Sequence, residues 1–137
     1  MRWGGRIAAA IEILNAVFAH HRPAADALRD WGKAHRFAGS GDRHAIGTLV
    51  YDVLRKRNSL AAAMGDQSPR SLVLAALRFG WGREPADIAA WLEEEHGPGR
   101  ITEGESAALT NTVSDEAPAH IAGDFPGLEI EFWAIRG

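Results

Sequence analysis

Residues 42–63, DRHAIGTLVYDVLRKRNSLAAA, decide the fold class, because their apolar side chains recur with the period of an α-helix. The side chains that fall within about 140° of one another on a helical wheel are Ile46, Leu49, Val50, Val53, Leu54 and Leu60. The segment is therefore predicted to form one amphipathic helix. The apolar side of this helix must pack against other parts of the chain.

Helical signals of the same kind extend in both directions from this segment. Proline or a capping box (Thr102 with Glu105) marks several helix starts. The predicted helices cover 3–21, 23–36, 42–63, 69–81, 85 to a stop at 97–99, 102–111 and 115–121. The one over 69–81 is apolar nearly all round, which places it at the centre. The prediction is an all-α fold, a compact bundle of about six to seven helices, with the alternating residues 128–132 in a tail.

Length and composition limit the chemistry that this chain can perform. Its 137 residues are about one domain, and the absence of cysteine excludes disulfides, thiolate metal sites and a cysteine nucleophile. The six histidines show no metal-binding spacing, and no serine lies in a nucleophile elbow. We therefore expect no catalytic, cofactor-binding or metal-binding residues in this chain.

The N-terminal apolar run over residues 7–19 has some features of a signal peptide. Glu12 and Asn15 interrupt the run, and its apolar residues recur at helical spacing. No stretch approaches the roughly 20 apolar residues that a membrane-spanning helix needs. The sequence therefore predicts a cytoplasmic protein that does not associate with membranes.

Charge divides the chain into a basic and an acidic half. Residues 1–70 hold eleven Lys and Arg against six Asp and Glu, a balance of +5, whereas residues 71–137 hold four against twelve, a balance of −8. A basic N-terminal half favours contact with a polyanion such as nucleic acid.

The basic residues that could contact RNA fall into two groups. Arg29, Lys33 and Arg36 lie at i, i+4 and i+7 and form one outward stripe, and Arg43 begins the next helix beside the Gly39-Ser40-Gly41 turn. The second group is Arg55, Lys56 and Arg57. These seven residues are the candidate RNA-binding set.

A structural interpretation competes with RNA binding for these residues. Asp26 and Asp30 are spaced to neutralise the first group through local ion pairs. Arg57 falls on the apolar side of its helix, where it could instead bind carbonyls or a carboxylate across the bundle.

Several motifs resemble the N-terminal domain of the bacterial Sun (Fmu, RsmB) family of ribosomal RNA cytosine-5 methyltransferases, which is itself similar to the antitermination factor NusB. The resemblance extends from Arg6 to about Leu128. The motifs that carry it are Ala34-His35-Arg36-Phe37, Gly41-Asp42-Arg43, Ile46-Gly47, residues 49–55 (LVYDVLR), Pro118-Ala119-His120-Ile121 and Asp124-Phe125-Pro126.

The resemblance implies a NusB-like helical RNA-binding domain over residues 1–123 and, over 124–137, a connector toward a methyltransferase domain that this chain lacks. The parent enzyme would use S-adenosylmethionine and ribosomal RNA, and this chain alone would not be catalytic. The alternative is a free NusB-type adaptor for transcription antitermination or the ribosome, which binds RNA together with a ribosomal or transcription protein. A reading frame that continues into a cysteine-bearing methyltransferase domain would support the methyltransferase module over the free adaptor.

Overall fold

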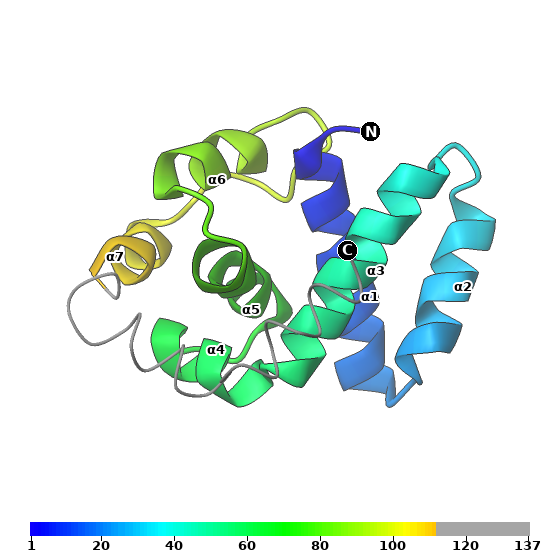
Figure 1. Cartoon of the computed structure of the whole chain (residues 1–137), viewed down its shortest axis with the longest axis horizontal. Helices are drawn as coiled ribbons and strands as arrows, with labels where there is room; N and C mark the ends of the chain where they lie inside the picture. The colour runs from blue at the N-terminus through cyan, green and yellow to red at the C-terminus, as the bar shows by residue number, and fades with distance from the viewer. Residues whose placement is uncertain (112–137) are drawn as a thin grey trace.

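The computed structural model describes residues 1–111, and every regular element in that range is helical (Figure 1). The elements in chain order are α1 (Trp3–His20), α2 (Ala24–Ala34), α3 (Ser40–Arg55), α4 (Arg57–Met64), α5 (Pro69–Ala75), the π-helical turn η1 (Ala76–Gly80), α6 (Pro85–Leu92) and α7 (Glu103–Asn111). The predicted all-α bundle is confirmed.

The centre of the bundle is α5 with η1. Figure 1 shows α5 enclosed by the other helices, and each residue from 71 to 77 is buried. Leu72, Leu74 and Leu77 are completely buried, as the apolar pattern of this segment predicts, whereas Phe79 is only half-buried. The helix without a polar face thus lies where no face meets water.

Helices α1, α2 and α3 form the other side of the molecule. The α1 helix packs against α2, α3 and α5, and it buries Ile7, Ile13 and Leu14 completely or nearly so. It ends at His20 and is followed by the C-cap residue His21, whose φ of 52° is left-handed. The α2 helix packs on α1 and α3 at the edge of the bundle, so most of its outer side faces water (Figure 1).

Local signals placed several helix starts correctly. The Ser68 hydroxyl accepts a hydrogen bond from the Ser71 amide at 3.2 Å, with Pro69 at the first helical position of α5. The Glu105 amide donates to the Thr102 hydroxyl at 3.1 Å, and the Thr102 amide donates to the Glu105 carboxylate at 2.9 Å. These two bonds form the predicted capping box of α7.

The prediction of one continuous helix over residues 42–63 is wrong, because the chain bends at Lys56. Lys56 has φ −110° and ψ 18°, outside the helical range, and the residue is only 3% exposed. The bend lays α4 against α5 and α7, where Leu60 becomes completely buried. A straight helix would carry these residues past the central helix, so tertiary packing overrides the local periodicity.

Three other features of the predicted helices also differ. The last turn of the segment 69–81 is π-helical rather than α-helical. The α6 helix ends at Leu92 rather than near 97, and α2 ends at Ala34 rather than near 36. The predicted helix over 115–121 and the tail over 124–137, including 128–132, lie outside the described residues. Within the described range, no helix is both long enough and apolar enough to cross a membrane.

Candidate nucleic-acid interface

Three of the seven candidate RNA-binding residues line one groove between α2 and α3. Arg29 and Lys33 come from α2, Arg43 comes from the first turns of α3, and the hollow between them measures about 380 Å³. The apolar part of the lining includes Leu28, Trp31 and Ile46. We call this hollow, with its lining residues, the α2–α3 groove.

The position of Arg43 is set by the carbonyl end of α2. Its Nε donates to the Ala38 carbonyl at 3.1 Å, and its Nη2 donates to the Gly32 carbonyl at 3.0 Å. A cation at this place complements the negative end of the α2 dipole. Because a guanidinium group carries five N–H donors, Arg43 keeps donors beyond these two bonds.

Gly32 allows this close approach. A Cβ atom at Gly32 would lie 2.9 Å from Nη1 of Arg43 and would push the guanidinium away. The sequence offered no sign of this requirement, because the two residues are eleven positions apart on different helices.

The ion pairs on α2 differ from the competing interpretation at one point. Asp26 pairs with Arg29 at 2.8 Å, as that interpretation expects. Asp30 instead pairs with Arg22, whose hydrogen bond is the largest cause that lowers the pKa of the Asp30 carboxyl. Lys33 therefore forms no ion pair with any residue of the range 1–111.

Arg36 follows the end of α2 and is exposed, but it does not line the α2–α3 groove. It extends the basic surface toward the loop that connects the two helices. Within residues 1–111, Arg36 has no hydrogen-bond or ion-pair partner. Lys33 and Arg36 are thus exposed cations without an ion pair in the described part of the chain.

The second candidate group lies at the other end of α3. Twelve residues of helix separate Arg43 from Arg55, about 18 Å along the axis. Arg55 pairs with the buried carboxylate of Asp52, and Lys56 is buried. The structure therefore does not join this group to the α2–α3 groove.

Arg57 is exposed and is the first residue of α4. Its guanidinium carbon lies 3.9 Å from the centre of the Phe18 ring, a cation–π contact with α1. This contact differs from the carbonyl or carboxylate partner that the sequence suggested. It holds the start of α4 against the end of α1.

A stripe of cations beside an apolar floor suits a single-stranded nucleic acid. Guanidinium and ammonium groups bind phosphates, while apolar and aromatic surfaces accept base faces. Among residues 1–111, no three His, Cys, Asp or Glu side chains cluster in a way that could hold a metal ion.

Comparison with known proteins gives no relative: the sequence matches no protein-family profile, no curated protein and no solved structure.

Proposed function

We propose that this chain is an RNA-binding module that contacts single-stranded ribosomal RNA through the α2–α3 groove and the adjoining Arg36. The observation that carries the proposal is the convergence of Arg29, Lys33 and Arg43 from two helices on one hollow with an apolar floor. The phosphates would lie along the cations, and one or two bases would pack toward the floor.

The resemblance to the N-terminal domain of the Sun family supports placing this module in a methyltransferase. In such an enzyme the module would seat the RNA, and a separate domain would bind S-adenosylmethionine and modify cytosine. The motifs that carry the resemblance include Arg36 and Arg43, two residues of the proposed interface. A reading frame that encodes both domains in one polypeptide would support this placement, whereas a free adaptor would be encoded alone.

The salt dependence of RNA affinity tests the interface. Fluorescence anisotropy with a labelled single-stranded oligoribonucleotide gives the dissociation constant at several concentrations between about 50 and 200 mM salt. Each phosphate contact to a single strand contributes about 0.7 to the slope of log K against log salt. Lys33→Gln should therefore reduce the slope by about 0.7, and the triple change of Arg29, Lys33 and Arg36 to Gln by about 2.

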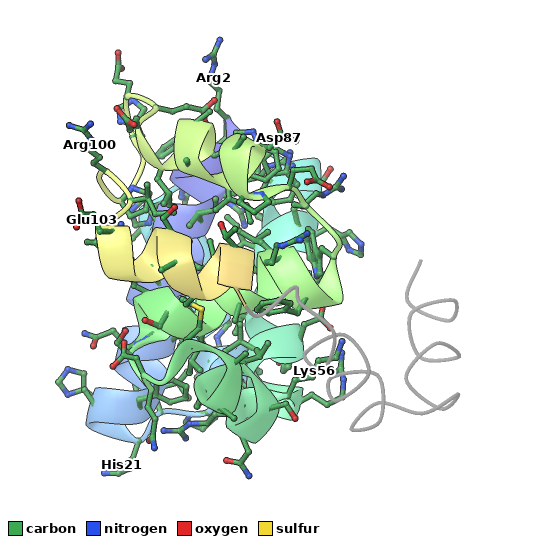
Figure 2. The ribbon with its side chains drawn as sticks, turned by 90° about the vertical axis from the view of Figure 1, so that its left-hand side faces the viewer. Arg2, His21, Lys56, Asp87, Arg100 and Glu103 are labelled. Atoms are coloured by element: carbon green, nitrogen blue, oxygen red, sulfur yellow. The ribbon has the colours of Figure 1, made fainter. Side chains whose placement is uncertain are left out.

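Arg100→Gln is the matched control, because Arg100 is an exposed arginine near α7 and outside the groove (Figure 2). It should leave the slope unchanged. Gly32→Ala adds a positional test, since the new methyl group displaces Arg43 without changing any charge. If the triple variant binds RNA with the affinity and slope of the original chain, the α2–α3 groove is not the interface.

A further inference from the structure

A second hollow lies on the other side of α2 from the α2–α3 groove. It measures about 400 Å³ and opens between the first half of α1, the end of α2 with its following loop, and the turn after α6. In Figure 1 all three segments lie toward the upper end of the bundle. We call it the α1–α6 cleft. It shares only Trp31 with the α2–α3 groove, so the two can be occupied independently.

One wall of the α1–α6 cleft is aromatic. The His35 ring stacks on Trp31 with centroids 4.2 Å apart and planes at 10°, and its Nδ1 lies 2.8 Å from the Trp31 carbonyl oxygen. Phe37 meets His35 edge-on at 5.8 Å. Phe37 is nevertheless 75% exposed, the largest exposure of any bulky apolar side chain in the described range.

The α1 helix lines the cleft with small residues. Gly5, Ala8 and Ala9 line the cleft, and the side chain of Met1, 45% exposed, lies beside them. Met1 and Phe37 are thus two exposed apolar residues that border the same hollow. A concave apolar surface of this kind, left open to water, is typical of a binding site.

Carboxylates determine what can enter. Glu12, Glu94 and Glu95 all line the α1–α6 cleft. The cations beside them are Arg2 and the N-terminal ammonium of Met1, which lies 3.8 Å from Asp42, and His96 lies 3.1 Å from Glu95. Glu94 accepts a hydrogen bond from the Gly4 amide at 2.7 Å and lies 3.6 Å from Arg2. Glu12 has no ion-pair partner within residues 1–111. The excess of negative charge repels phosphate and attracts cations, so this face disfavours RNA.

We propose that the α1–α6 cleft binds a basic segment of a partner protein, which inserts one apolar side chain against Phe37 and Trp31 and sets a Lys or Arg beside Glu12 and Glu95. The apolar anchor would bury the exposed face of Phe37 and supply most of the affinity. The carboxylates would select a cationic sequence and speed its association. This second site is independent of the RNA proposal, since it uses the other side of α2.

Selection from a phage-displayed library of random peptides tests the proposal without assuming a partner. The whole chain serves as bait, and the enriched peptides are resynthesised and measured by fluorescence anisotropy. The expected consensus is an aromatic or large aliphatic residue flanked by Lys or Arg. Failure to enrich any sequence, or enrichment of acidic sequences, would overturn the proposal.

Variants then assign the peptide to the cleft. Ala8→Phe fills the hollow and Phe37→Ser removes one wall, and each should weaken binding by at least about tenfold. Ala62→Phe on α4 is the matched control for a new surface phenylalanine, because Ala62 is exposed and lies outside the cleft. Peptide affinity that Ala8→Phe leaves unchanged would contradict the assignment.

Charge reversal separates the electrostatic part of the proposal from the apolar part. Glu12→Lys with Glu95→Lys should slow association of the basic peptide several-fold while changing its dissociation rate little. Glu93→Lys is the control, since Glu93 neighbours Glu94 in sequence but does not line the cleft.

Phe37→Ser should leave RNA affinity unchanged. If it weakens RNA binding and not peptide binding, Phe37 belongs to the RNA surface and the proposal is wrong.

Discussion

Replacing Arg70 should detach α7 from the bundle, because this one side chain ties three segments together. From the first turn of α5, its Nε donates to Oε2 of Glu105 at 2.7 Å and its Nη2 donates to Oε1 at 3.0 Å. The same guanidinium donates to the carbonyls of Pro98 at 3.2 Å and Gly99 at 3.0 Å in the loop before α7. Leu109 of α7 is completely buried and depends on this placement.

The size of the effect follows from the burial of the pair. The side chains of Arg70 and Glu105 are 24% and 12% exposed, so water screens them only in part. Removing one member of a fully buried pair costs about 3–5 kcal/mol, and a single hydrogen bond to a charged group contributes about 1.5–3 kcal/mol. We therefore expect Arg70→Met to lower the free energy of unfolding by about 2–3 kcal/mol, or the melting temperature by about 8–12 °C.

The pKa of Glu105 gives the same pair a pH signature. Burial raises the pKa of this carboxyl, but the hydrogen bonds from Arg70 and Thr102 outweigh burial and hold it below its ordinary value of 4.5. The unfolded chain therefore binds the proton more readily than the folded chain. The pair's contribution is complete above pH 4.5 and is lost as the pH falls through the lower folded pKa.

Urea unfolding followed by circular dichroism measures these quantities, at neutral pH and in steps toward pH 3. A double-mutant cycle of Arg70→Met with Glu105→Gln isolates the coupling between the two side chains. Arg100→Met is the control, because the Arg100 side chain is exposed. A loss below about 0.5 kcal/mol for Arg70→Met, the size of an ordinary surface change, would refute the reasoning.

Three further predictions concern the core, a buried carboxylate and the cofactor. Leu77→Ala should lower the free energy of unfolding by about 2–5 kcal/mol, since Leu77 is completely buried, and a loss under about 0.5 kcal/mol in urea would contradict its central position. Asp42→Asn should lower the free energy of unfolding by about 1.5–3 kcal/mol at pH 7 and by far less near pH 3. The reason is that burial raises the pKa of Asp42, but the Arg6 hydrogen bond at 2.9 Å and the Gly39 amide outweigh burial and hold this pKa below 3.8. Equal losses at both pH values would exclude this account. Isothermal titration calorimetry should detect no binding of S-adenosylmethionine to the chain, and saturable micromolar binding would require a different interpretation of the fold.

Part of the candidate interface was predictable because it depends on helical phase alone. Arg29 and Lys33 are four positions apart, so they share one side of α2 in any fold that keeps this helix, whereas Arg36 lies beyond its end. The sequence did not predict the Asp30–Arg22 pair, which leaves Lys33 without an ion pair. Arg22 precedes α2, and the direction of its side chain depends on how α1 ends.

The sequence by itself determined the fold class, most helix starts and the central helix, because these depend on spacing within short segments. Helical periodicity shows which side of a helix is buried, and caps and prolines act on the next few residues. Only the tertiary structure decided the bend at Lys56, the burial of that lysine, the packing of Arg43 against Gly32 and the placement of Phe37 and the carboxylates after α6 around one cleft. Each of these joins residues from different helices, and their distance is fixed by how whole helices pack, which no local pattern of residues encodes.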